Sequence, residues 1–223
     1  MIVGVIGRAR SGKNTVAKIA GEEAWAAVGQ EVEELAFADP LKRFCQEVYD
    51  FTDEQLWGPS EERNKPDERY PRPHDFSDPT GTGSWSCEQC GKCYDVLTPV
   101  CSYLTPREAL QTLGTQWGRT CWPDTWLALG LRRAREAEAR GSLVFLTDCR
   151  FINEGRAIKA GGGLLWRVER PGTSGASVGI AGHASEMEQE TKEMLKLVDV
   201  RICNDGDLSL LRSKVLAALR SIK

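Results

Sequence analysis

Residues 7–15 read G-R-A-R-S-G-K-N-T and match the pattern G-x-x-x-x-G-K. A short apolar run, I-V-G-V-I at residues 2–6, comes directly before this stretch, and a helical pattern follows it. Glycines let the backbone curl so that successive N–H groups point into one cavity, and a following helix adds positive potential at its N-terminus. The stretch therefore predicts a strand, a phosphate-binding loop and a helix, in that order.

The side chains of this loop indicate what it would hold. Lys13 supplies a point charge for the β- and γ-phosphates of a nucleoside triphosphate. Asn14 stands where Ser or Thr usually holds Mg²⁺, and Thr15 comes one residue later, so Thr15 is the expected metal ligand in the loop. The residues expected to bind ATP are Gly7, Arg10, Ser11, Gly12, Lys13, Asn14 and Thr15.

Short β-type runs alternate with amphipathic stretches along the chain, a pattern typical of βαβ units and a parallel sheet. The fold class expected is α/β of the P-loop NTPase type, with an about five-stranded parallel sheet flanked by helices. The expected strands are 2–6, 32–37, 143–147, 164–168 and 200–203. The expected helices are 13–28, one starting at the capping box of 105–108, 124–140, 151–160 and one after 205–207.

We expect a single P-loop domain over residues 1–223, with two segments that depart from its periodic pattern. Between Gly58 and Tyr103 periodicity disappears and Pro, Gly, Asp and Cys dominate, which predicts an inserted substrate-side loop region at about 58–104. A Gly/Ser/Ala-rich stretch at about 170–185 has the composition of a mobile lid. Arg167 and Arg170 are the expected lid arginines.

Composition sets limits on the function. The 223 residues include 41% hydrophobic and 27% charged residues, as in ordinary globular proteins, and the net charge is −3. A slightly acidic chain is not built to coat nucleic acid, and no apolar run approaches the ~20 residues that span a bilayer. We therefore expect no stable nucleic-acid or membrane partner and a cytoplasmic location, in the host cell if the protein is viral. The sequence is compatible with a homodimer and does not decide it.

Two acids are expected at the carboxyl edge of the sheet, where ligands of open α/β sheets bind. Asp148 follows the expected strand 143–147, which has four apolar residues, and is a candidate Mg²⁺ ligand, with a solvated turn acid as the alternative. Asp39 follows the second expected strand and is a candidate catalytic residue, although capping a helix that begins at Pro40 would also explain it.

Four of the eight cysteines are close in sequence: Cys87, Cys90, Cys93 and Cys101. The Cys87-x-x-Cys90 spacing is half of a zinc ribbon, so a structural Zn²⁺ with these four ligands is one interpretation. A set of exposed reduced thiols is the other. Residues 64–67, N-K-P-D, fit the guanine signature of GTPases only formally, because no buried strand precedes them.

The motifs together resemble the deoxynucleoside monophosphate kinases of tailed bacteriophages. The blocks that carry the resemblance are the loop 7–15, FADPLK at 37–42, LWGPSEERN at 56–64, TPREALQ-x-LG at 105–114, WGR at 117–119, D-x-RF-x-NE at 148–154 and HASE at 183–186. The ordered set covers nearly the whole chain, apart from the cysteine cluster. The resemblance implies transfer of the γ-phosphoryl group of ATP to a deoxynucleoside 5′-monophosphate, with Mg²⁺ and without a covalent enzyme intermediate.

The resemblance also implies roles for individual residues. The catalytic residues would be Lys13, Asp39, Asp148 and Arg150, and the acceptor-binding residues Asp39, Lys42, Arg63, Arg107 and Arg119. Three alternatives stay open on the sequence: a kinase of another phosphorylated metabolite, similar to phosphomevalonate kinase; a P-loop switch or motor; and a zinc-containing nucleic-acid-binding module.

Overall fold

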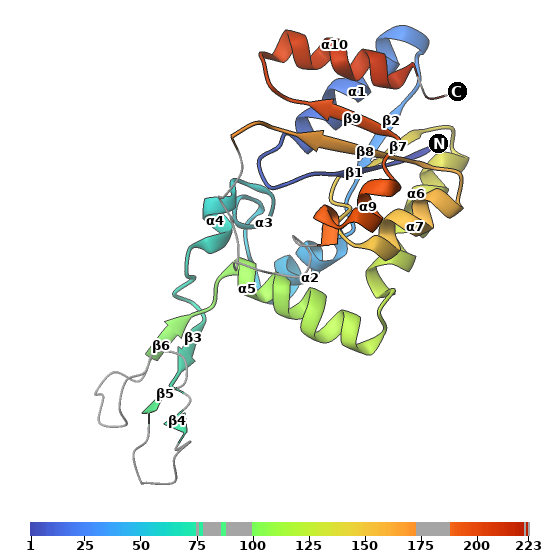
Figure 1. Cartoon of the computed structure of the whole chain (residues 1–223). Helices are drawn as coiled ribbons and strands as arrows, with labels where there is room; N and C mark the ends of the chain where they lie inside the picture. Colours follow the sequence, from blue (N-terminus) through green and yellow to red (C-terminus); the bar gives the residue numbers. More distant parts are fainter. Residues whose placement is uncertain (75, 78–85, 88–99, 173–187, 221, 223) are drawn as a thin grey trace. The chain divides into compact units, whose positions relative to one another are not determined.

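The computed structural model describes residues 1–74, 76–77, 86–87, 100–172, 188–220 and 222 (Figure 1). The chain divides into two compact units. The larger unit comprises Met1–Asp39 and Cys121–Lys223, and the smaller unit comprises Pro40–Thr120. The smaller unit thus begins before the expected insertion at 58–104 and ends after it.

The larger unit is built on a five-stranded sheet in the order β2-β7-β1-β8-β9, with every neighbouring pair parallel. Its strands are β1 (Ile2–Ile6), β2 (Val32–Leu35), β7 (Leu143–Leu146), β8 (Leu164–Glu169) and β9 (Val200–Cys203). Every residue of β1 and β7 is buried, as expected for apolar strands covered on both faces. The expected α/β fold with a five-stranded parallel sheet is confirmed.

Helices cover both faces of this sheet, and the alternation along β1 divides the core between them (Figure 1). Val3 and Val5 pack with the apolar faces of α1 (Lys13–Val28) and α10 (Leu208–Leu219). Ile2 and Ile6 pack on the opposite face. The helices of that face are α6 (Thr125–Ala139), α7 (Ile152–Ala160) and α9 (Lys192–Lys196).

The smaller unit is mainly helical, with a small core of Cys45, Phe51, Leu56 and Ala109. Its helices are α2 (Asp39–Tyr49), which begins at the unit boundary, α3 (Asp53–Trp57), α4 (Ser60–Asn64), α5 (Pro106–Gln111) and the π-helix η1 (Thr112–Arg119). The expected capping box is present, because Thr105 and Glu108 exchange hydrogen bonds at the start of α5.

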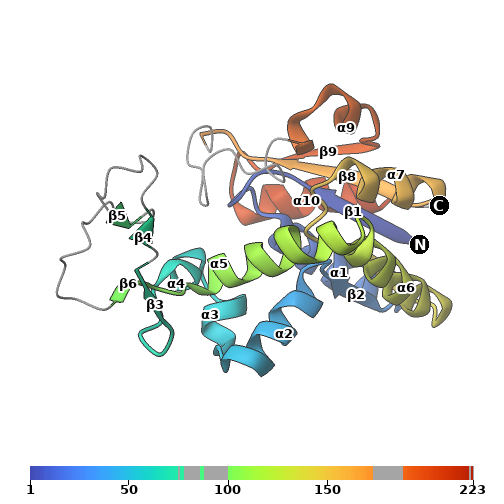
Figure 2. The ribbon, with the colours of Figure 1, turned by 90° about the horizontal axis from the view of Figure 1, so that it is seen from below.

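Two short antiparallel ribbons also belong to the smaller unit. Figure 2 shows β3 (Pro71–Pro73) beside β6 (Val100–Tyr103), and β4 (Phe76–Ser77) beside β5 (Ser86–Cys87). The expected loop region at 58–104 therefore contains a helix and strands. Of the expected lid at about 170–185, residues 173–185 lie outside the described residues. Within the described part of the chain, no helix has both the length and the apolar character needed to cross a membrane.

Candidate functional site

The phosphate loop joins the carboxyl end of β1 to α1, and two of its glycines have backbone angles that favour glycine. Gly7 has φ 148° and Gly12 has φ 101°. A Cβ atom on Gly7 would lie 2.3 Å from the backbone oxygen of Val168, and one on Gly12 would lie 2.6 Å from the side-chain nitrogen of Asn204. The curl of the loop therefore requires glycine at both positions, as the sequence pattern predicts.

Lys13 lies in the first turn of α1, with its ammonium group against the loop. Its Nζ donates hydrogen bonds to the carbonyl oxygens of Gly7, at 2.6 Å, and Arg8, at 3.0 Å. The neighbouring Asn14 and Thr15 are exposed, so the Thr15 hydroxyl is accessible. The Ser11 hydroxyl is buried and has no hydrogen-bond partner among the described residues. The loop thus carries a fixed cation, an accessible hydroxyl and a buried hydroxyl.

Two side chains that the sequence analysis missed hold the loop in place. Asn204, directly after β9, donates a hydrogen bond from Nδ2 to the Ser11 carbonyl at 2.9 Å. The Gly7 N–H donates to Oε1 of Gln189, at 3.2 Å, in the 3₁₀ helix η2 (Glu188–Glu190). The sequence gives only a weak indication that Asn204 contacts the loop, because it is a polar residue at the end of an expected strand. No local sequence pattern marks Gln189.

Arg167 differs from its expected role as a lid arginine, because it lies within β8 with a relative exposure of 7%. Its guanidinium donates to Glu169 at 2.5 Å, to Glu190 at 2.9 Å and to the carbonyl of Gln189 at 3.1 Å. Burial pushes the pKa of Glu190 upward, but the hydrogen bond and charge of Arg167, with those of Arg8, leave that pKa below its ordinary value. Arg167 thus braces η2, and Arg170 is exposed at the end of β8.

Asp148 lies just after β7 and links this strand to the segment that follows β2. Its two carboxylate oxygens accept the backbone N–H groups of Phe37, at 2.7 Å, and Ala38, at 3.0 Å. Burial raises the pKa of Asp148, against the opposing effects of these hydrogen bonds and of the Arg150 charge. Asp39 is the first residue of α2, and its Oδ2 accepts the N–H of Ala36, three residues earlier, at 3.1 Å. This bond is not that of an N-cap, whose side chain accepts an N–H from inside the helix.

Arg150 is exposed two residues after Asp148, and its guanidinium makes no ion pair with the described residues. The turn that carries it is fixed by the buried Glu154. One carboxylate oxygen of Glu154 accepts the N–H groups of Arg150, at 2.7 Å, and Phe151, at 2.9 Å. The backbone of Arg150 is therefore held, while its charge remains available at the end of the strand.

In the smaller unit, two of the expected acceptor arginines meet at one serine. Arg63 and Arg107 both donate to Oγ of Ser60, at 3.3 Å and 3.2 Å. Arg63 also donates to the carbonyl oxygens of Leu56 and Gly58, and Arg107 to the side-chain oxygen of Asn64. These bonds orient both guanidinium groups. We call Arg63 and Arg107 the arginine pair.

The two remaining basic acceptor candidates lie elsewhere in the smaller unit. The Lys42 ammonium is 5.4 Å from the centre of the Trp57 ring, a cation–π distance. Arg119 ends η1, and π-helical turns occur often at functional sites. Ser60 and Asn64, which hold the arginine pair, were missed as positioning residues because short polar side chains beside an arginine carry no distinctive sequence signal.

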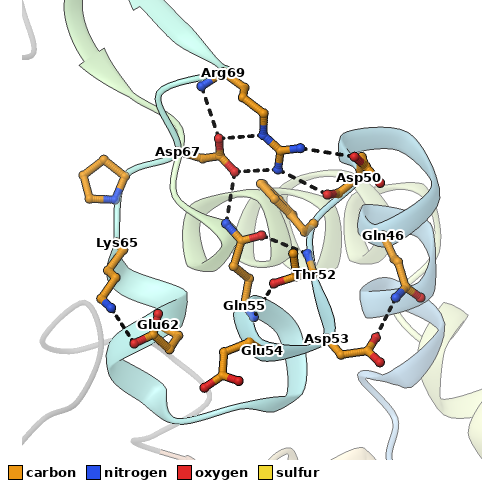
Figure 3. Close-up of a pocket in the computed structure, with 12 residues that line it drawn as sticks. Gln46, Asp50, Thr52, Asp53, Glu54, Gln55, Glu62, Lys65, Asp67 and Arg69 are labelled. Carbon is orange, nitrogen blue, oxygen red and sulfur yellow. Dashed lines mark hydrogen bonds and ion pairs between the residues drawn. The ribbon is translucent and has the colours of Figure 1, made fainter.

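The smaller unit also has a cavity of about 770 Å³ (Figure 3). Its lining is rich in acids, so it is poorly suited to a phosphate group. Asp67 lies in this lining and binds Arg69 through both carboxylate oxygens and Gln55 through one. The helix α4, rather than a strand, precedes Asp67, in agreement with the dismissal of residues 64–67 as a guanine signature.

The Asp67 contacts predict a pH-dependent stability. Hydrogen bonding from Arg69 holds the pKa of Asp67 well below its usual range. The stabilisation that the ionised Asp67 carboxylate gives to the folded chain is therefore present above pH ~4 and is lost as the pH falls through the folded-state pKa. We expect D67N to lower the free energy of unfolding by about 1 kcal/mol at pH 7, with a smaller difference at pH 3. Urea unfolding at pH 7 and at pH 3 measures the difference in unfolding free energy between D67N and the parental chain. The matched control is D50N, whose carboxylate also contacts Arg69 but is 95% exposed; an equal loss in D50N would contradict the prediction.

The larger unit has the strand, glycine-rich loop and helix that define a P-loop nucleotide-binding fold, and Asp148 lies at the carboxyl end of a neighbouring strand. No protein-family model matches the chain. The chain is 25% identical, over 229 residues, to a protein of Acanthamoeba polyphaga mimivirus named "Putative deoxynucleotide monophosphate kinase". The match covers 98% of this chain and 96% of the viral protein.

Two solved structures are also similar to this chain. One is TT1252 from Thermus thermophilus, with 17% identity, a TM-score of 0.46 and coverage of 100% of this chain and 97% of that one. The other is a dephospho-CoA kinase from Campylobacter jejuni, with 13% identity, the same TM-score and the same coverage.

Proposed function

We propose that this protein is a deoxynucleoside monophosphate kinase, which transfers the γ-phosphoryl group of ATP to a deoxynucleoside 5′-monophosphate and releases ADP and the diphosphate for DNA precursor synthesis. The observation that carries the proposal is the glycine-dependent phosphate loop with Lys13 held against it. The full-length similarity to the mimivirus protein and the resemblance to the tailed-phage enzymes support the nucleotide substrate.

On the donor side, the backbone N–H groups of the loop and the Lys13 ammonium would bind the β- and γ-phosphates of ATP. Mg²⁺ prefers oxygen ligands and takes only one or two from the protein when phosphates supply others. The accessible Thr15 hydroxyl and the Asp148 carboxylate fit this donor set, so they would hold the ion. When bound, Mg²⁺ neutralises charge that develops on the phosphate oxygens.

On the acceptor side, the arginine pair would bind the phosphate of the monophosphate. Guanidinium groups bind phosphate through two parallel hydrogen bonds, and Ser60 holds both groups in orientation before the substrate arrives. Lys42 and Arg119 supply further positive charge in the same unit. Asp39, at the start of α2, would orient the acceptor.

The transfer itself needs positioning and charge stabilisation more than covalent chemistry from the protein. A phosphate oxygen of the acceptor attacks the γ-phosphorus, and the bond from that phosphorus to the β–γ bridging oxygen breaks, leaving ADP with the electron pair. Arg150, whose turn Glu154 fixes, would stabilise charge on the transferring group. The expected lid at 170–185, with Arg170 at its start, would exclude water as a competing acceptor.

A substrate panel tests the proposal. ADP release would be measured with ATP and Mg²⁺ in the presence of dTMP, dGMP, 5-hydroxymethyl-dCMP, the matching ribonucleotides and phosphomevalonate. We expect at least one deoxynucleoside monophosphate to raise ADP release far above the rate without acceptor. Stimulation by phosphomevalonate alone would identify a kinase of another metabolite, and hydrolysis that needs no acceptor would indicate a P-loop switch or motor.

A further inference from the structure

Three metal-binding side chains of the smaller unit come together from segments that are separate in the sequence. His74 directly follows β3, Cys87 ends β5 and Cys101 lies in β6. One ligand atom from each residue, the imidazole nitrogen or the thiol sulfur, lies within 4.8 Å of the other two. Cys87 is buried, and the other two are partly buried. A His-Cys-Cys set of this kind provides the nitrogen and sulfur ligands that zinc prefers.

The strand pairing explains how Cys101 reaches the other two residues. Arg72 pairs with Ser102, but the next residue of β3, Pro73, pairs with Val100, so the register shifts by one residue. Cys101 is therefore the extra residue of a β-bulge, a feature that redirects a side chain. In the other ribbon, Cys87 pairs with Phe76, two residues after His74, which brings the end of β5 close to His74.

The distance between the two sulfurs also fits a shared metal ion. Cys87 Sγ and Cys101 Sγ are 3.5 Å apart, and neither cysteine is part of a disulfide. Two thiolates on a tetrahedral zinc with Zn–S bonds of ~2.3 Å lie about 3.8 Å apart, whereas a disulfide requires ~2.05 Å. The observed spacing is close to the zinc value without any rearrangement of the strands.

The surrounding structure gives a physical reason for a metal at this place. The strands β4 and β5 have two residues each, and two-stranded ribbons of this size are not stable alone in water. Among the described residues, the hydrophobic core of Cys45, Phe51, Leu56 and Ala109 contains no residue of β3, β4, β5 or β6. A bound metal can replace a hydrophobic core in holding such short strands together.

We propose that His74, Cys87 and Cys101 bind a structural Zn²⁺ ion that holds the two ribbons of the smaller unit together. The ligand set differs from the four cysteines expected from the sequence, because it includes His74. Cys90 and Cys93, which belonged to that expectation, lie outside the described residues. The ion has no part in phosphoryl transfer, so the site stands or falls independently of the proposed function.

Metal analysis of the full-length chain tests the proposal without any nucleotide. After expression in zinc-supplemented medium and removal of loose metal by gel filtration, elemental analysis is expected to find about one zinc per chain. H74Q, C87S and C101S should each lose most of this zinc. The matched control is C121S, which removes an exposed cysteine of the larger unit and should keep the parental zinc content.

A second measurement covers variants that fail to fold. Co²⁺ added to the metal-free parental chain should give the intense thiolate-to-cobalt charge-transfer absorption of a tetrahedral site, and Zn²⁺ should abolish it. Zinc content below a tenth of an ion per chain, together with no cobalt spectrum, would overturn the proposal. Parental zinc content in a folded H74Q, with loss in C87S and C101S, would overturn the assignment of His74.

Discussion

Lys13→Ala is expected to lower the turnover of phosphoryl transfer by about 10²–10³-fold while the chain keeps its fold. The Lys13 ammonium lies against the carbonyl oxygens of Gly7 and Arg8, at the loop where the phosphates would bind. It is a preorganised cation, so its removal leaves developing charge on the transferring group without one of its main stabilising partners. Steady-state ADP release, with saturating acceptor, measures the loss.

The control for this variant is Lys18→Ala, which removes an exposed lysine from the same helix. Lys18→Ala should keep parental turnover, and circular dichroism should show that both variants retain their helices. Parental turnover in Lys13→Ala would mean that the donor phosphates bind elsewhere. The phosphate loop would then be a structural turn, and the proposed function would fail.

Arg107→Met is expected to lower kcat/KM for the deoxynucleoside monophosphate by about 10²-fold. Methionine keeps most of the aliphatic length of arginine but has no charge and no hydrogen-bond donors. The arginine pair then keeps one guanidinium group at Ser60 and loses the other. Because the substitution lies on the acceptor side, the KM for ATP should change little, and titrations of the two substrates separate the effects.

Two further variants strengthen this test. Arg107→Lys keeps the charge but loses the planar fork that binds phosphate through two hydrogen bonds, so its kcat/KM should lie between those of Arg107→Met and the parent. Arg43→Met removes an exposed arginine from α2 and should have parental kinetics. A rise in the KM for ATP alone in Arg107→Met would place Arg107 with the donor instead of the acceptor.

Local patterns in the sequence were enough to predict the sheet, the phosphate loop and the capping box at Thr105. Apolar runs such as 143–146 form buried strands because a strand covered on both faces must be apolar throughout. The glycines of the loop were recognisable because positive φ angles and close backbone approach leave few other choices. Each of these features depends on neighbours within a few residues.

Other contacts of the site could not be predicted in this way. Arg167 was expected to act with a lid, but it is buried within β8 and paired with Glu190. The sequence did not predict this pair because Glu190 lies 23 residues later. Ser60 orients Arg107 across 47 residues. Such pairs leave no periodic signal, since either partner alone looks like an ordinary polar residue.

By itself, the sequence determined the order of strands and helices and the place of the phosphate loop, because backbone sterics and the burial of apolar side chains act over short stretches. Only the tertiary structure decided that Asn204 and Gln189 hold this loop, and that His74 lies beside Cys87 and Cys101. The physical reason is that strand pairing and the bulge at Cys101 bring together residues whose separation in sequence says nothing about their distance in space.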